Sequence, residues 1–445
     1  MPDLVIVPRS GHTVSRSLID PDALRVLYRL HSSRFTAYLV GGSVRDMLLG
    51  RRPKDFDIGT SAHPYEVKKL FRNCWIIGRR FRLAHVRFGT KTIEVATFRR
   101  HVSAAELPAD ETPESRPPLE AATDATGGTA TDATADADFL QHRDNTFGTP
   151  EEDAFRRDFT INALFYDIAD FSIIDYTGGL RDLEARVVRC IGDPDERLQE
   201  DPVRMIRAVS MASRLDFTID PPLDAAIEVH RDLLARSAPA RLIEEIYKLL
   251  RAGSSEKAFR MLAERGLLGP LAPDLQRRAG DALWKSLGAL DAYRRRVPDA
   301  PERLTNALLL GTLLLPIGFD LRPPSVAFRP DGKPRKEPAL ALGILPLARR
   351  DIERLRHIQN FQRRLTDMSM SPRARRALLH RGPFAEALTW LDMHGEAPET
   401  VEHWRGFIEA AKAFEPEAPA PVAGEPPRGR RRRRRRRRPS KPTPS

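Results

Sequence analysis

Residues 39–46 read Leu-Val-Gly-Gly-Ser-Val-Arg-Asp and decide how the first part of the chain is expected to fold. The apolar run 36–40 predicts a strand, the paired glycines predict a sharp bend, and the run 44–49 predicts a helix. Glycine lets the backbone approach a ligand closely, and the first turn of a helix presents free N–H groups to phosphate. An arginine one turn into that helix can clamp a triphosphate oxygen. The segment therefore predicts a nucleotide-binding loop made of Gly41, Gly42 and Arg45.

Two acidic side chains follow this loop in the triplet Asp55-Phe56-Asp57. Alternate residues of a strand point to the same face, so a strand over 55–58 would hold both carboxylates about 7 Å apart at their Cα atoms. Hard oxygen ligands of this kind suit Mg²⁺. An isolated Asp-x-Asp is more often a turn or a helix cap, but the glycine loop just upstream favours a metal site at Asp55 and Asp57.

Glu94 is a single acidic residue in the apolar run Ile93–Ala96, which belongs to a predicted β-hairpin around residues 89–91. A buried carboxylate without a partner is costly. Glu94 is therefore expected to bind a metal, to be paired, or to lie on the solvent face of the strand. Beside Asp55 and Asp57, metal ligation is the interpretation that we favour.

The triplet Arg156-Arg157-Asp158 is a second polar cluster. Arg157 could pair with a phosphate or a ribose, because a guanidinium group donates in a fork that matches these oxygens. The alternative is that Asp158 caps a helix and that the two arginines lie on the surface.

The segment 200–207 is a third cluster, in which Asp201 and a following proline predict the start of a helix. Arg204 and Arg207 follow at i+3 spacing, so they share one helix face with Asp201. Arg204 lies in the first turn, where the helix dipole disfavours a cation. This mismatch suggests that Arg204 pairs with a base edge or a triphosphate. The alternative is an exposed helix start.

The basic character of the chain is concentrated at its end. The net charge is +12, and residues 428–445 contribute +11 of it through ten Arg and one Lys. Such a run repels itself and is expected to be disordered, either as a tether for a polyanion, which we favour, or as a solubilising tail. Cys74 and Cys190 form no framework, and neither a membrane span nor a secretory signal is evident, so a cytoplasmic location is expected.

Together these motifs resemble class II nucleotidyltransferases, the family of CCA-adding enzymes and bacterial polyadenylate polymerases within the DNA polymerase β superfamily. The resemblance covers roughly residues 20–265. Segments 41–46 and 55–57 look like the family's catalytic motif, 156–158 like its ribose-selecting motif, and 200–204 like its protein template for the incoming base. Residues 175–183 are similar to the hinge between head and neck.

The resemblance implies an α+β fold with a polymerase-β-like head and a small mixed sheet, followed by an all-helical neck and body. The expected segments are a flexible N-terminus (1–20), a catalytic head (21–182) with a disordered insertion (about 102–138), a neck that binds nucleotide and RNA (183–265), a helical body (266–414) and a disordered basic tail (415–445).

The resemblance also implies the activity of a polynucleotide adenylyltransferase, which adds AMP from ATP to RNA 3′ ends with two Mg²⁺ ions. Residues 70–86 and the arginine-rich tail favour the polyadenylate polymerase branch; the alternatives are a CCA-adding enzyme and a non-catalytic RNA-binding protein. RNA-degradation or helicase partners would be compatible with it. The implied catalytic residues are Asp55, Asp57 and Asp158; the nucleotide-binding residues are Gly41, Gly42, Arg45, Arg157, Asp201, Arg204 and Arg207; the metal ligands are Asp55, Asp57 and Glu94.

Overall fold

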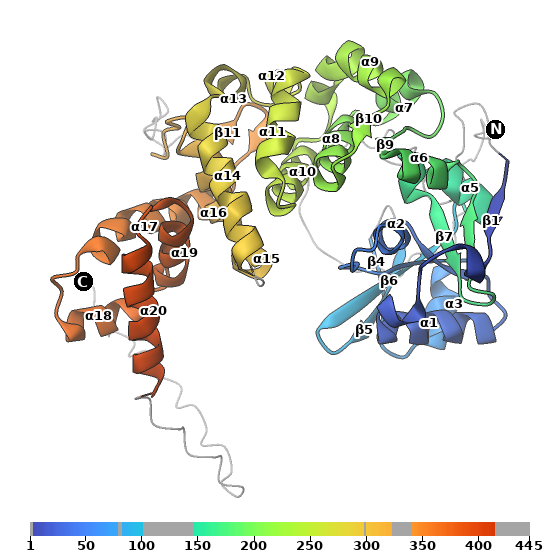
Figure 1. Cartoon of the computed structure of the whole chain (residues 1–445), viewed down its shortest axis with the longest axis horizontal. Helices are drawn as coiled ribbons and strands as arrows, with labels where there is room; N and C mark the ends of the chain where they lie inside the picture. Colours follow the sequence, from blue (N-terminus) through green and yellow to red (C-terminus); the bar gives the residue numbers. More distant parts are fainter. Residues whose placement is uncertain (1–2, 79–81, 101–145, 298–299, 323–339, 414–445) are drawn as a thin grey trace, which may run out of the picture.

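The computed structural model describes residues 3–78, 82–100, 146–297, 300–322 and 340–413. These residues form an arch, with a sheet-containing head at one end and the C-terminal helices at the other (Figure 1). The predicted insertion at about 102–138 and the tail at 415–445 lie outside the described residues.

The head is built on one eight-stranded sheet, in which only the β3–β6 pair is parallel. The fold class is therefore α+β, as predicted, but the sheet is larger than the small one expected. In spatial order its strands are β1 (Val5–Val7), β8 (Ile173–Asp175), β7 (Leu164–Asp167), β2 (Ala37–Val40), β3 (Asp57–Thr60), β6 (Lys91–Thr97), β5 (Leu83–Phe88) and β4 (Cys74–Ile77).

The two faces of this sheet differ. Leu39, Ile58 and Val95 lie on the face that joins the main hydrophobic core, to which the helices α1 (Pro21–Ser32) and α3 (Pro64–Leu70) contribute. The opposite face carries a smaller apolar cluster at Val40 and Phe165. Polar residues can therefore occupy the rest of that second face. The other head helices are α2 (Gly42–Leu48), α5 (Pro150–Phe155) and α6 (Gly179–Ala185).

After the head the chain is mainly helical, as predicted, with two small two-stranded sheets that were not expected. One consists of β9 (Val187–Val188) and β10 (Thr218–Ile219), the other of β11 (Ala341–Leu342) and β12 (Leu345–Pro346). The most apolar of the helices after the head, α16 (Asn306–Leu314), is fully buried apart from its first residue. The other helices are α7 (Pro194–Glu200), α8 (Val203–Leu215), α9 (Pro221–His230), α10 (Pro239–Arg251), α11 (Ser255–Glu264), α12 (Leu268–Leu271), α13 (Pro273–Arg278), α14 (Asp281–Arg296), α15 (Ala300–Arg303), α17 (Arg349–Thr366), α18 (Pro372–Leu379), α19 (Phe384–His394) and α20 (Pro398–Ala413).

The N-terminal segment 1–20 was expected to be flexible, and this expectation is wrong for its described part. Val5–Val7 forms the edge strand β1, which pairs antiparallel with β8, and Val14 is fully buried. A three-residue strand is too short to show an alternating pattern, and its partner lies far away in the sequence. None of the helices described here has the length and apolar character that crossing a bilayer requires.

The hinge motif at residues 175–183 is held by one buried carboxylate. Asp175 accepts hydrogen bonds from the backbone N–H groups of Thr177, Gly178, Gly179 and Leu180 at 2.8–3.0 Å. A Cβ atom at Gly179 would lie 2.2 Å from the backbone oxygen of Thr160. The glycine therefore allows α6 to pack against the backbone that follows Asp158.

Replacement of Gly179 by alanine is expected to lower the free energy of unfolding by about 2–3 kcal/mol, because the backbone at Thr160 cannot move aside as a side chain could. Gly406→Ala is the matched control. Gly406 lies within α20 with open space around the added Cβ, so this change should be neutral or stabilising by up to about 1 kcal/mol. Urea unfolding of both variants measures the difference, and equal stabilities would contradict the close contact.

Candidate active site

The glycine loop between β2 and α2 has the geometry that requires glycine. Gly41 has φ +70°, and a Cβ atom there would lie 3.1 Å from Nη1 of Arg157. A side chain would be strained in this conformation and would press on Arg157. The loop and the Arg156-Arg157-Asp158 segment, which are far apart in the sequence, are therefore brought into contact.

Asp57 lies beside the start of this loop, because it pairs in register with Val40, the residue before Gly41. The pKa of Asp57 is raised to about 6, first by the surrounding protein, which removes water from the carboxylate, and next by the charge of Glu94. Arg157 opposes this rise and Asp55 adds to it. Asp57 is nevertheless an exposed residue, so the protein removes only part of the water around its carboxylate. The structure thus brings Gly41, Asp57 and Arg157 together, with Asp55 and Glu94 near enough to act on Asp57.

Glu94 does not complete a three-carboxylate cluster. It lies on β6 directly opposite Asp57, but its side chain is 49% exposed and its Oε1 lies 3.5 Å from Nε2 of His85. Within the described residues, no three His, Cys, Asp or Glu side chains lie close enough together to hold a metal ion. The arrangement is therefore open, with Glu94 beside His85 on the exposed face of the sheet, and metal binding by Asp55, Asp57 and Glu94 remains a prediction.

The carboxylates that are present still fit Mg²⁺. This cation typically takes one or two carboxylates together with waters and substrate phosphates, rather than a closed cage of protein ligands. Asp55 and Asp57 offer hard oxygens, and the raised pKa of Asp57 reflects in part the repulsion that a cation would relieve.

Arg45 supports the loop from the protein side. Its guanidinium group is buried and donates to Oδ1 of Asp46 from Nε at 2.8 Å and from Nη2 at 2.7 Å, and also to the side chain of Asn162. Arg214 of α8 binds the other oxygen of Asp46 at 2.9 Å. In this arrangement Arg45 ties the loop to the 3-10 turn Thr160–Asn162 before β7 and, through Asp46, to α8. It could reach a phosphate only by exchanging these partners.

Arg157 is held against the loop by Asp153 of α5. Its Nε and Nη2 donate to one oxygen of Asp153 at 3.1 and 2.8 Å, and its Nη1 donates to the backbone oxygen of Asn162 at 3.2 Å. Burial alone would raise the pKa of Asp153, but the charges of Arg157 and Arg156 outweigh it and lower that pKa. Asp153 therefore stays ionised and fixes Arg157.

Asp158 joins the head to helix α8. Its Oδ1 accepts from Nε of Arg204 at 2.8 Å and its Oδ2 accepts from Nη1 of Arg207 at 2.5 Å. Burial would raise the pKa of Asp158, but the charges of Arg207 and Arg204 outweigh it and lower the pKa. A carboxylate with both oxygens occupied and a lowered pKa is a poor proton acceptor. Asp158 is thus placed to orient these two arginines, and no described contact brings it to Asp55 or Asp57.

Arg204 is held through its Nε and Nη1 atoms. Besides Asp158, its Nη1 donates to the backbone oxygen of Arg197 at 2.6 Å and to Glu200 at 3.0 Å. Asp201 does not bind it; its Oδ1 accepts from the N–H of Val203 at 3.3 Å, and its Oδ2 accepts from Arg241 of α10 at 2.8 Å. The expected helix start at Asp201 is confirmed to within one residue. Asp201 itself precedes α8, which begins at Val203, and roles of Asp201 and Arg204 in binding the base remain predictions.

Sequence reasoning missed several residues that hold the site together. Arg197 of α7 donates from Nη2 to the backbone oxygens of both Arg156 and Arg157, at 2.8 Å each. Asp153 fixes Arg157, and Asn162 binds Arg45. Arg197 and Asp153 are charged and buried, and charged residues are almost never fully buried unless they are paired. Their burial is the only signal that marks them, and it is visible in the structure rather than in the sequence.

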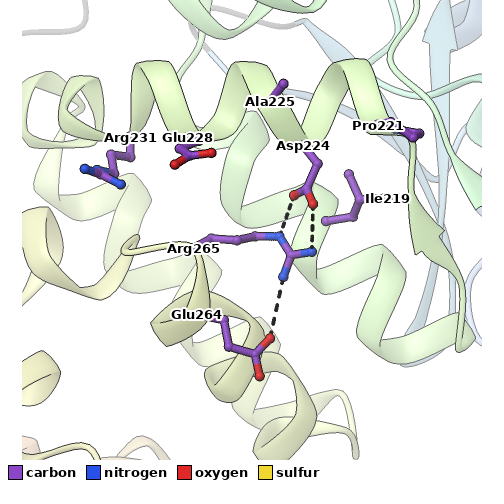
Figure 2. Close-up of a pocket in the computed structure, with 8 residues that line it drawn as sticks. All are labelled: Ile219, Pro221, Asp224, Ala225, Glu228, Arg231, Glu264 and Arg265. Atoms are coloured by element: carbon purple, nitrogen blue, oxygen red, sulfur yellow. Dashed lines mark hydrogen bonds and ion pairs between the residues drawn. The ribbon is translucent and has the colours of Figure 1, made fainter.

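Two cavities lie away from these residues. One, of about 600 Å³, opens between α9 and α11, where Nε of Arg265 donates to Asp224 at 2.6 Å (Figure 2). The other, of about 700 Å³, lies among α14, α19 and α20. None of the residues predicted to bind nucleotide or metal lines either cavity, so neither is assigned to the nucleotide.

Comparison with known proteins gives consistent results. A family model of the poly A polymerase head domain matches residues 37–189, one of a probable RNA- and SrmB-binding site of polymerase A matches 216–278, and one of the polymerase A arginine-rich C-terminus matches 341–439. The fold is thus that of a nucleotidyltransferase. The chain belongs to the family of poly(A) polymerases and CCA-adding enzymes, because these three models match successive parts of it.

Individual relatives belong to both branches of this family. Poly(A) polymerase I of Salmonella typhi is 48% identical over 62% of this chain and 55% of its own length. The CCA-adding enzyme of Lactobacillus johnsonii is 35% identical over 55% of this chain and 54% of its own length. The chain therefore spans little more than half the length of the curated relatives it matches.

Solved structures confirm the fold. The Bacillus stearothermophilus CCA-adding enzyme in complex with CTP aligns with a TM-score of 0.59 and 26% identity, over 88% of this chain and 83% of that one. A tRNA nucleotidyltransferase with a primer tRNA and an ATP analogue aligns with a TM-score of 0.52 and 22% identity, over 87% and 99%. The second likeness concerns the fold alone.

Proposed function

We propose that this chain is a template-independent polyadenylate polymerase, which adds AMP from ATP to the 3′ ends of RNA. The observation that carries the proposal is Asp57 beside Gly41 and Arg157, with Asp55 and Glu94 acting on its charge. The higher identity to poly(A) polymerase I than to CCA-adding enzymes supports this branch of the family.

In the proposed reaction the RNA 3′ oxygen attacks the α-phosphorus of ATP, a phosphodiester forms, and pyrophosphate leaves. Asp55 and Asp57 would hold two Mg²⁺ ions, which when bound lower the pKa of the 3′ hydroxyl and neutralise phosphate charge. The backbone of Gly41 and Gly42 would approach the triphosphate closely, and Arg157, fixed by Asp153, would pair with the ribose or a phosphate. Arg45 would hold the loop in shape.

The fixed position of Arg204 supports selection of one base. Asp158, Glu200 and the backbone oxygen of Arg197 bind its guanidinium group, so its remaining donor capacity points in one direction. Asp201, two residues before α8, and Arg207 on that helix would complete the surface that faces the base. A CCA-adding enzyme must read both cytosine and adenine, for which a single rigid donor pattern is less suited.

The proposal is tested by incubating the protein with an unstructured RNA and each nucleoside triphosphate separately, with Mg²⁺, and measuring product length. ATP alone is expected to give long, heterogeneous tails, with CTP at least about 100-fold poorer, the order of discrimination that loss of one or two good hydrogen bonds gives. Addition that stops after three nucleotides and requires CTP would instead identify a CCA-adding enzyme. RNA binding without incorporation would leave a non-catalytic RNA-binding protein.

The location and the partners follow from the same proposal. Cys74 and Cys190 are both free thiols, which suits a reducing compartment such as the cytoplasm. Residues 216–278, which match the RNA- and SrmB-binding model, would bind RNA and are where a helicase or RNA-degradation partner would be sought. Capture of such a partner should depend on this segment and not on Asp57.

A further inference from the structure

One row of paired residues crosses the sheet from the candidate active site to its far edge. Asp57 on β3 pairs with Glu94 on β6, Glu94 pairs with His85 on β5, and His85 pairs with Trp75 on β4. Directly paired residues of neighbouring strands point to the same face of a sheet. Trp75 therefore stands on the same face as the Asp57 carboxylate, three strands away.

The row ends on the edge strand β4, where an aromatic side chain and an aliphatic one are exposed. Trp75 and Ile77, two residues apart on β4, are each 50% exposed. Arg87 of β5 lies on the same face, with its Cζ atom 5.7 Å from the centre of the Trp75 ring. The alternate residues, Cys74 and Val86, are buried on the opposite face. The exposure of Trp75 is thus a property of this face and not of a frayed edge.

The chemistry of this surface matches single-stranded RNA. An exposed indole offers a face on which any base can stack, and a neighbouring arginine can pair with the phosphate that links two bases. The apolar area of Trp75 and Ile77 is small beside that of a stable protein–protein interface, which argues against a protein partner. Trp75 lies on the same face of the sheet as Asp57, so the ligand that best fits this surface is the RNA substrate of the same reaction.

We propose that Trp75 and Arg87 form a stacking platform for the RNA upstream of its reacting 3′ end. This inference rests on the proposed function and adds a path for the RNA to it. Three strand spacings place the platform about 14 Å from Asp57. At about 3.4 Å per nucleotide along a strand, single-stranded RNA covers that distance in about four nucleotides.

The test compares Trp75→Ala with Tyr65→Ala, an equally simple loss of an exposed aromatic ring on α3. With a long single-stranded adenylate oligonucleotide, Trp75→Ala should raise the KM for RNA about tenfold, the order expected for one lost base stack. The KM for ATP and kcat should not change. With a dinucleotide primer, which is too short to reach the platform, the variant should match the wild type. Trp75→Phe should restore most of the affinity, and Tyr65→Ala should change nothing.

Binding of the same oligonucleotides, followed by quenching of tryptophan fluorescence without ATP, separates this inference from the proposed function. Quenching by the long oligonucleotide that is lost in Trp75→Phe supports the platform even if no incorporation is seen. Incorporation by a Trp75→Ala variant whose KM for the long oligonucleotide equals that of Tyr65→Ala overturns the platform and leaves the polymerase. An equal effect on the long oligonucleotide and the dinucleotide also overturns it.

Discussion

Replacement of Asp57 by asparagine is expected to lower AMP incorporation by about 10³-fold or more, because the amide loses the negative charge that would hold the catalytic cations. RNA binding should stay nearly unchanged, since no RNA phosphate is expected to contact this carboxylate. The measurement is single-turnover extension of a labelled RNA at saturating ATP and Mg²⁺, beside a filter-binding assay with the same RNA.

The same variant should not lose stability. A carboxyl group whose pKa is raised to about 6 in the folded protein binds its proton more tightly there than in the unfolded chain, where the value is 3.8. Stability therefore falls as the pH rises from about 4 to about 6, and at neutral pH the charged Asp57 destabilises the fold. Asp57→Asn removes a charge that partial loss of water and the neighbouring carboxylates disfavour, so its thermal midpoint at pH 7 should equal or exceed that of the wild type.

Asp170→Asn is the matched control, because the hydrogen bond that Asp170 accepts from Ser172 lowers its pKa. Asp170 lies in the turn between β7 and β8, so activity should persist while stability falls slightly. In the wild type, incorporation at subsaturating Mg²⁺ should decline as the pH falls through about 6, where Asp57 takes up a proton. An Asp57→Asn variant that still polymerised at a near wild-type rate would refute the assignment of the metal site.

How far this site could be predicted depends on how local its determinants are. The bend at Gly41 and a strand at Asp57 could be predicted, because a strand, a glycine pair and a second strand are all encoded within residues 37–60. The predicted strand 55–58 is shifted, since β3 begins at Asp57 and Asp55 lies outside it. The partners of Arg45 could not, because Asn162 lies 117 residues away and reaches it only through the pairing of β2 with β7. The same applies to β1, whose partner β8 comes near the end of the head.

For the charged clusters, too, the sequence predicts the local geometry but not the partners that lie far away in the sequence. The i+3 spacing of Arg204 and Arg207 correctly indicated one shared helix face, and both side chains do meet a single group. That group is Asp158 of the head, which contacts α8, and it is not Asp201, which is nearer in the sequence. Which acid neutralises which arginine is decided by tertiary packing, and a linear spacing carries no information about it. The exposed face of β4 was also invisible, since a four-residue edge strand shows too little alternation.

Replacement of Asp158 by alanine is expected to lower the free energy of unfolding by about 3 kcal/mol. This is the lower end of the range for breaking a buried ion pair, because the Asp158 side chain remains 21% exposed. The change leaves Arg204 and Arg207 facing each other without the carboxylate that binds both. Glu200 and Glu245 still lie near these arginines and limit the loss.

This stability difference should depend on pH in a defined direction. The pKa of Asp158 is lowered from 3.8, so its contribution is fully present above about pH 4 and is lost as the pH falls further, when the wild-type carboxylate takes up a proton. Urea unfolding of the wild type and of Asp158→Ala across this pH range should therefore show that the difference in their free energies of unfolding becomes smaller in acid. A gap that is independent of pH would mean that alanine acts by loss of packing and not by loss of charge.

Loss of the contact between Asp158 and Arg204 should affect catalysis more strongly than it affects stability. Without Asp158 the guanidinium group of Arg204 loses one of its three fixed partners, so we expect discrimination between ATP and CTP to fall by about tenfold, the equivalent of one hydrogen bond. Asp158→Asn should retain part of the discrimination, since its amide oxygen can still accept from one arginine. If Asp158→Ala lost all incorporation with ATP and CTP alike, while remaining folded, Asp158 would act in the chemical step itself, and the role of orienting Arg204 would have to be abandoned.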